Sequence, residues 1–362
     1  MSAAAEAPAA GSAVMGALEG FFDPAIVLRR RQIFRLAFGM TLSSAIAFGI
    51  AWPLSFLTPV LAAKLLTTPR ALGPKQQIGF LVILWAGLTV GTELLLPLLS
   101  YPAVHLLFTG LALFLLFYQK AAGTNPIIIV FMLIGVIVVP LIGTVQPSLA
   151  RGVAQGLVVA AAVSVLTIYI SGALFPDPKD APAPPKPKAA APKPSSKECA
   201  MLALRSFVVL YPLVVLFQLY SMTGAAVMLI FAMMLSLEPT YGVHLKAGSG
   251  LILANLSGGL VGVILYQLLV MVPSFWFFLM LCLLSGLMIG NQIFSGTQLG
   301  KLLSAGITAV FIVLGPTLTG DAAAGANLAL RLALIAAGVI YVVLAFGLLE
   351  RLTQGAQRMQ TS

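Results

Sequence analysis

The sequence predicts an all-α polytopic membrane protein with about 12 transmembrane helices, arranged as two parallel six-helix repeats. Of its 362 residues, 60% are hydrophobic and only 8% are charged, whereas water-soluble domains carry about a quarter charged residues. Apolar runs long enough to cross a bilayer recur along the chain. A charged, proline-rich segment from Phe175 to Glu198 divides these runs into two halves of similar length.

The apolar runs give the predicted spans directly. They are rich in alanine and glycine and lack the alternating polar face of a barrel strand, which favours helices. The first half contains spans at 33–51, 54–67, 78–98, 102–119, 126–145 and 152–175. The second half contains spans at 203–220, 223–237, 248–271, 273–290, 300–319 and 328–349.

The remaining segments flank or join the repeats. We expect an N-terminal cytoplasmic or interfacial segment at 1–32, with a short surface helix around Phe21 to Leu28, and a cytoplasmic tail at 351–362. The repeats occupy 33–175 and 199–350, and the linker between them, 176–198, contains many prolines and lysines. Such a composition favours an extended tether, with binding to anionic lipid as the alternative.

Basic residues near the span ends set the predicted orientation. Placing both termini in the cytoplasm puts most lysines and arginines there, as the positive-inside rule requires, and leaves only Arg151 and Arg331 outside. Six spans per half is an even number, so both halves point the same way. The net charge of +10 is therefore explained by topology, and it indicates no nucleic-acid partner.

Several features recur in the same order in both halves, which indicates an internal repeat. Small residues are equally spaced in the third spans and allow helices to approach closely. The matched features are Arg35 with Arg205, Thr68-Pro69 with Glu238-Pro239, Gly79–Gly91 with Gly250–Gly262, Pro140 with Pro316, and Arg151 with Arg331.

The chain also resembles a known family. The stretch RLAFGMTLSSAIAFGIAWPLSFLTPVLAAKLL, followed by TPRALGPKQQIGFLVILWAGLTVG and its echo EPTYGVHLKAGSGLILANLSGGLVG, is similar to the fusaric acid resistance superfamily. The likeness is greatest to its short bacterial DUF2955 branch, which lacks the large cytosolic domains of longer members, and it covers the chain from Arg30 to Glu350.

This resemblance implies export of aromatic carboxylic acids, such as fusaric or hydroxybenzoic acids, across the bacterial inner membrane. Members often work beside a periplasmic adaptor of the HlyD type and an outer-membrane channel. The superfamily is also similar to plant aluminium-activated malate channels, whose six-span subunits pair around an anion path. By that likeness, one chain here corresponds to one such dimer, and further homo-oligomerisation stays open.

Positive charges near the span ends are the first candidates for binding an anionic substrate. Arg35 and Arg205 would gather a carboxylate from the cytoplasm, and Arg151 and Arg331 would receive it at the outer side. The alternative is that they only anchor the topology. Lys64, near the end of the short second span, either places a cation inside the pathway or extends to the interface.

Helix breaks near the outer side form the second group of candidates. Pro140 and Pro316 interrupt the fifth spans, and Thr144 and Thr317 would add hydroxyl donors beside them. Backbone groups freed at such breaks can face a solute in transporters. Simple kinks without a ligand are the alternative.

Glu93 and His105 are the candidates for proton coupling. They lie at similar depth in the third and fourth spans, on either side of a turn at Ser100-Tyr101-Pro102. A carboxylate beside an imidazole in a low dielectric can exchange a proton near neutral pH. A mutually satisfied structural pair is the alternative.

The sequence contains no enzyme signature. It has no phosphate-binding G-x-x-x-x-G-K-[ST] loop, no His/Cys spacing for a metal, and no nucleophile elbow, so we expect neither an enzyme nor a cofactor. Three functions remain: a proton-coupled exporter of organic acids, a passive organic-anion channel, and a membrane scaffold for the adaptor.

Overall fold

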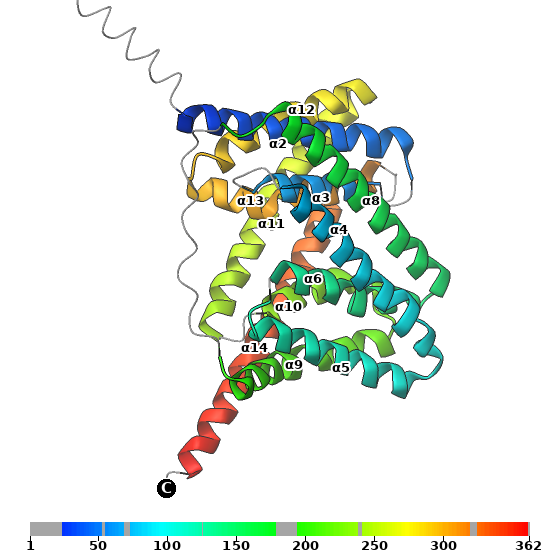
Figure 1. Ribbon diagram of the computed structural model, residues 1–362, viewed down its shortest axis with the longest axis vertical. Coiled ribbons are helices and arrows are strands. Elements are labelled where there is room, and N and C mark those ends of the chain that lie inside the picture. The colour runs from blue at the N-terminus through cyan, green and yellow to red at the C-terminus, as the bar shows by residue number, and fades with distance from the viewer. Residues whose placement is uncertain are drawn as a thin grey trace, which may run out of the picture.

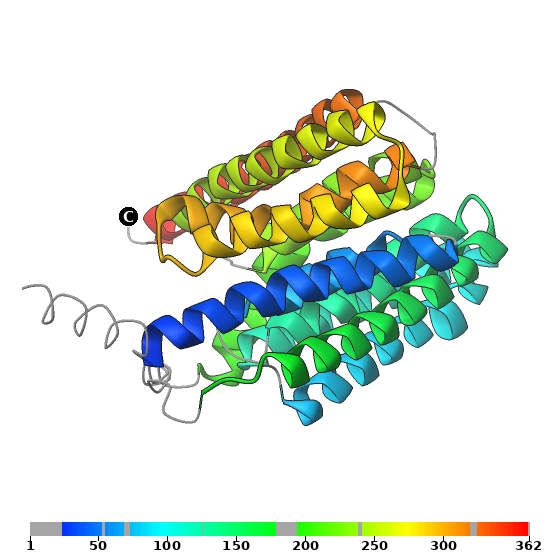
Figure 2. The same ribbon diagram turned by 90° about the horizontal axis from the view of Figure 1, so that it is seen from above.

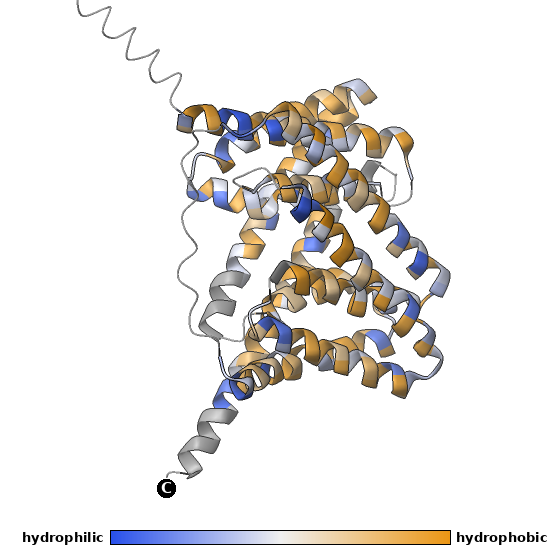
Figure 3. Ribbon diagram, viewed as in Figure 1, coloured by the Kyte–Doolittle hydropathy of each residue, from blue (hydrophilic) through white to orange (hydrophobic). Residues whose placement is uncertain are grey.

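The computed structural model describes residues 24–52, 55–68, 73–124, 126–178, 194–237, 241–318 and 324–360. Over these residues the chain forms helices and no strand (Figure 1). Hydrophobic residues make up most of each helix, and hydrophilic residues lie mainly near helix ends (Figure 3). The described part of the chain is therefore all-helical, as the sequence predicts.

The helices follow one another along the chain with short connections. In the first half they are α2 (Pro24–Ile50), α3 (Leu57–Leu66), α4 (Pro74–Thr89), the π-helix η1 (Val90–Leu95), the 3₁₀ turn η2 (Pro97–Ser100), α5 (Pro102–Ala121), α6 (Pro126–Leu133), the π-helix η3 (Ile134–Val138), α7 (Val139–Gly143) and α8 (Pro147–Leu174). In the second half they are α9 (Ser196–Leu219), the 3₁₀ turn η4 (Thr223–Ala225), α10 (Ala226–Ser236), α11 (Tyr241–Met271), α12 (Phe275–Ile293), α13 (Gln298–Leu318) and α14 (Ala324–Gln360).

The helix lengths indicate a multi-pass membrane protein. Among the described residues, 9 helices are long and apolar enough to cross a membrane. Three shorter apolar helices, at Leu57–Leu66, Ile128–Gly143 and Thr223–Ser236, lie where the sequence predicts spans. A polytopic membrane protein is thereby supported, while the full count of crossings stays a prediction.

Two terminal segments differ from their prediction. The expected separate surface helix near Phe21–Leu28 is wrong in its described part, because α2 begins at Pro24 and continues unbroken to Ile50. Similarly, α14 does not end with the apolar span but extends to Gln360. In both places a helix continues from an apolar run into a polar segment. Pro24 stands at the first position of α2, where proline is tolerated, and α14 contains no proline.

Each half packs against the other through its first helix. Helix α2 lies along α12, and α9 lies along α5, at opposite ends of the view in Figure 1. Two large hydrophobic clusters lie at these two contacts between the halves. One joins α5 and α6 to α9, α10 and α14, and the other joins α2 and α3 to α12 and α13. Figure 2 shows α2, α4 and α8 in one layer and α11 to α14 in the other.

Glycines allow the closest helix contacts. A Cβ atom added at Gly135 of η3 would collide with the backbone carbonyl of Gly87 in α4, and one at Gly91 would collide with the carbonyl of Gly135. In the second half, a Cβ at Gly306 of α13 would collide with the carbonyl of Ala254 in α11. Small residues bring helices together in a bilayer because burial against lipid gives no hydrophobic gain.

The predicted break at Pro140 takes the form of a π turn. Proline has no N–H to donate into the helix, and η3 ends just before Pro140, after which α7 continues the helix to Gly143. The fifth helix of the first half is thus distorted but not interrupted. Pro316 lies within the last turn of α13, which is helical through this position.

We predict that Gly135→Ala and Gly306→Ala destabilise the protein, because each added Cβ meets a neighbouring backbone that cannot move away without separating two helices. Overpacking of this kind costs about 1–3 kcal/mol or more. The melting temperature of the purified protein measures the effect. Gly79→Ala and Gly250→Ala are matched controls in α4 and α11, where an added Cβ meets nothing within 4 Å. Equal melting temperatures for all four variants would contradict this packing.

Candidate anion-binding site

A buried arginine with one unpaired nitrogen is the main polar feature of the first helix. Arg35 lies in α2 with a side chain only 2% exposed, and its Nη1 donates to Oδ1 of Asp177 at 2.7 Å. Its Nη2 is also buried and has no hydrogen-bond partner among the described residues. Leaving such a donor unsatisfied is costly, so this nitrogen is suited to an added acceptor.

A cavity of about 300 Å³ has Arg35 in its wall. Its wall combines the cation with the amide of Gln77, the ring of Tyr169 and aliphatic side chains. The walls come from α2, the ends of α3 and α8, and the start of α4; the lining residues are Arg35, Leu65, Leu66, Thr68, Pro74, Gln77, Ile168, Tyr169, Gly172 and Ala173. This combination suits a small ligand with one anionic group and an apolar body.

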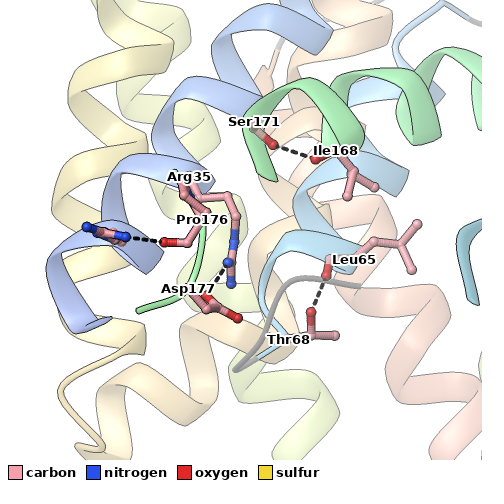
Figure 4. Close-up of polar contacts among 8 residues, drawn as sticks. Arg35, Leu65, Thr68, Ile168, Ser171, Pro176 and Asp177 are labelled. Atoms are coloured by element: carbon pink, nitrogen blue, oxygen red, sulfur yellow. Dashed lines mark hydrogen bonds and ion pairs between the residues drawn. The ribbon is translucent and has the colours of Figure 1, made fainter. Parts of the chain in front are cut away.

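The segment after α8 is held against α2 by contacts of three kinds. Phe175 stacks on Phe34 with ring centroids 5.9 Å apart, and Arg31 donates to the carbonyl of Pro176 at 2.7 Å. Figure 4 shows the Arg35 side chain reaching from α2 to Asp177, past this carbonyl. The predicted free tether is therefore wrong for its first residues, which are docked, while residues 179–193 lie outside the described part.

A second cavity, of about 460 Å³, lies at the other end of α8. Arg151 and Gln155 from the start of α8 face it together with Glu93 and Trp85 from the end of the α4–η1 helix. The structure thus places Arg151 and Glu93, which the sequence assigned to separate roles, on one cavity. Glu93 lies on a π turn, a distortion that is frequent at functional sites.

Among the described residues, no hydrogen bond or ion pair joins His105 to Glu93, so the direct pair considered from the sequence is wrong. His105 is buried on the α5 face that packs against α9, where Nδ1 lies 3.0 Å from the carbonyl oxygen of Leu95 and Nε2 lies 3.1 Å from Oε1 of Gln218. Glu93 is exposed on η1 and faces the cavity shared with α8. Similar depth in neighbouring spans did not predict the contacts of Glu93 and His105, because their helices turn these side chains in different directions.

The arginines that match in sequence do not share an environment. Arg35 is buried in an ion pair, whereas Arg205 is exposed on α9. Arg151 is exposed at a cavity, whereas Arg331 of α14 donates from Nε to Oδ1 of Asn255 at 3.2 Å and lies over the ring of Phe231 at 5.8 Å. The repeat therefore supplies matched positions but not matched chemistry.

The remaining candidates lie apart from both cavities. The exposed Lys64 extends from α3 to the carbonyl of Ser304 in α13, with Nζ 3.4 Å from the oxygen. Pro140 is buried, and the hydroxyl of Thr144 donates to the Leu141 carbonyl at 2.7 Å within its own helix. The side chains of Pro316 and Thr317 lie outside the described residues.

Sequence reasoning missed the partners of these residues. Asp177 lies in a segment that its prolines mark as a linker, so its carboxylate gave no signal as the counter-ion of Arg35. Gln218 is a polar side chain inside the predicted span 203–220, and that feature alone could have marked it as a candidate. Gln77 directly precedes the predicted span 78–98 and gave no such signal. Among the described residues, no group of three or more His, Cys, Asp or Glu side chains could hold a metal ion.

A family model described as "Protein of unknown function (DUF2955)" matches residues 32–171. The match begins just before Arg35 and ends within α8, so it includes the residues of both cavities except Gly172 and Ala173. It confirms the predicted resemblance to the DUF2955 branch over these residues, while the extension of the likeness to Glu350 and the link to the wider superfamily stay predictions. Neither a curated protein nor a solved structure matches the chain.

We predict that Arg331→Met lowers the melting temperature more than Arg151→Met does. The first change removes a hydrogen bond to the buried Asn255 and a cation–π contact, which together contribute about 1–3 kcal/mol. The second change removes an exposed charge, which contributes less than about 0.5 kcal/mol at most surface positions. Thermal unfolding of both purified variants checks the order, and an equal loss would contradict the different environments.

Proposed function

We propose that this DUF2955-like membrane protein exports aromatic carboxylic acids or related small organic acids across the bacterial inner membrane. One observation carries the proposal. Two cavities, each with an arginine in its wall, lie at opposite ends of the helix pair α4 and α8, which run side by side in Figure 1. A cation at each end of one helix pair suits the entry and release of an anion.

The inner cavity supports a carboxylate with an aromatic body. Arginine presents two parallel N–H groups that match both oxygens of a carboxylate, and Nη2 of Arg35 is available for one of them. Tyr169 and Ile168 in the same wall offer an aromatic and an aliphatic surface. The volume of about 300 Å³ is at the small end of ligand pockets, which favours a single-ring acid.

The proposed architecture is a pair of parallel six-helix repeats, 33–175 and 199–350, with 12 crossings and both termini cytoplasmic. Reciprocal packing supports it, since α2 lies on α12 and α9 lies on α5. The glycine contacts support it as well, since Gly91 packs on Gly135 and its counterpart Gly262 packs on Val310. In this arrangement Arg35 lies at the cytoplasmic face and Arg151 at the outer face.

Glu93 is the proposed coupling residue, because it shares the outer cavity with Arg151. In this proposal, a proton taken up by Glu93 from the periplasm removes a negative charge from the cavity that Arg151 also lines, which favours the departing anion there. His105 is the second proton-coupling candidate, since both of its ring nitrogens face oxygen atoms. Export would continue through a HlyD-type periplasmic adaptor and an outer-membrane channel.

We predict that Arg35→Gln lowers the initial rate of 4-hydroxybenzoate uptake into energised inside-out vesicles by at least about tenfold. The variant loses charge-assisted hydrogen bonds, each of which contributes about 1.5–3 kcal/mol, and about 1.4 kcal/mol corresponds to a tenfold change. Lys301→Gln is the control, because it removes an exposed charge at the same end of the bundle. Wild-type uptake by Arg35→Gln would contradict the proposal, and absence of uptake by the wild type with its adaptor would favour a scaffold.

We predict that Glu93→Gln abolishes accumulation driven by the proton gradient but retains exchange of labelled for unlabelled 4-hydroxybenzoate. Without a titratable carboxylate, anion movement is no longer linked to a proton, while the arginines still bind the anion. A protonophore should likewise stop accumulation by the wild type. Uptake that is unchanged by the protonophore and equal in the wild type and Glu93→Gln would indicate a passive anion channel instead.

A further inference from the structure

The ion pair between Arg35 and Asp177 joins a cavity wall to the beginning of the linker. Asp177 follows α8 and is 22% exposed, so its carboxylate can reach water, whereas Arg35 is 2% exposed. Nη1 of the guanidinium donates to this carboxylate, and Nη2 is buried without a hydrogen-bond partner among the described residues. Arg35 therefore has one nitrogen paired with an internal carboxylate and one buried nitrogen that lacks an acceptor.

We infer that Asp177 is an internal competitor for the anion site, which an incoming carboxylate displaces from Arg35. This inference rests on the proposed function for the identity of the anion. An incoming carboxylate first accepts a hydrogen bond from Nη2 and then takes the position of Asp177 at Nη1, so that both of its oxygens face the guanidinium. The total number of ion pairs is unchanged, which makes the exchange reversible.

Exchange at Arg35 also affects the docked segment Phe175–Asp177. This segment is held on α2 by the ion pair, by the hydrogen bond from Arg31 to Pro176, and by contacts of Phe175 with Phe34 and Phe38. Loss of the ion pair removes one of the contacts that hold this segment, while the aromatic contacts and the exposed hydrogen bond remain, so the docked position becomes less stable. Anion binding is therefore coupled to release of the linker from α2.

A competitor and a positioning residue give opposite results when the carboxylate is removed. If Asp177 competes with the anion, Asp177→Asn removes the carboxylate bound to Nη1 of Arg35 and tightens anion binding. If Asp177 instead holds Arg35 in a binding geometry, the same substitution weakens binding. The sign of the change thus separates the two roles.

The test is a titration of the purified full chain with benzoate, followed by calorimetry. We expect Asp177→Asn to lower the benzoate Kd by about tenfold, the size of one charge-assisted hydrogen bond. Asp180→Asn is the matched control, since it removes the same charge three residues further along and should leave the Kd unchanged. The double variant Arg35→Gln/Asp177→Asn removes both charges of the ion pair, so no charged group is left without its partner. We expect this variant to fold but to show no saturable binding of benzoate.

Trypsin cleavage in the linker reports release of the docked segment. Saturating benzoate should accelerate cleavage after Lys179 or Lys188 in the wild type, and Asp177→Asn should be cleaved at the faster rate without benzoate. Three results on the Kd would overturn the inference: an unchanged or higher Kd in Asp177→Asn, an equal fall of the Kd in Asp180→Asn, or saturable binding to the double variant. Absence of saturable binding to both the wild type and Asp177→Asn would also overturn it. So would a cleavage rate that neither benzoate nor Asp177→Asn changes. Binding with this pattern but without vesicle uptake would refute the exporter and leave the exchange intact.

Discussion

Close backbone approach between helices is the constraint on which this fold depends. Within a bilayer, apolar side chains gain little from leaving lipid for another helix, so packing contacts and hydrogen bonds must hold the bundle together. Gly87, Gly91 and Gly135 bring the third and fifth helices of the first half into backbone contact. The π turns η1 and η3 lie at this crossing, and they set the direction of Glu93 and the position of Pro140.

The two cavities lie at the margins of this crossing. Helix α8 packs on α4 as well as on α2, α3 and α7, and the cavities occur where α4 and α8 end. A charge buried in such a place is costly unless it is paired, which explains why Arg35 has a counter-ion from outside the helices. The same requirement explains why Asp177 and its neighbours dock on α2 although prolines surround them.

Hydropathy was sufficient to locate the helices, because a span must be long and apolar whatever it contacts. Each described long helix overlaps a predicted span. Arg35 and Arg151 were also found from sequence, since charges beside apolar runs are few. Their partners were not found: 142 positions separate Arg35 from Asp177, and no local pattern predicts which helix face meets a distant segment. Glu93 and His105 were wrongly paired for the same reason.

The direct test of the account is a structure of the protein with 4-iodobenzoate, whose iodine is located independently of the protein model. The account predicts the ligand carboxylate within about 3 Å of the Arg35 guanidinium, the iodine among the residues that line the inner cavity, and Asp177 displaced. Iodine found only outside that cavity, with the Arg35–Asp177 pair intact, would contradict it.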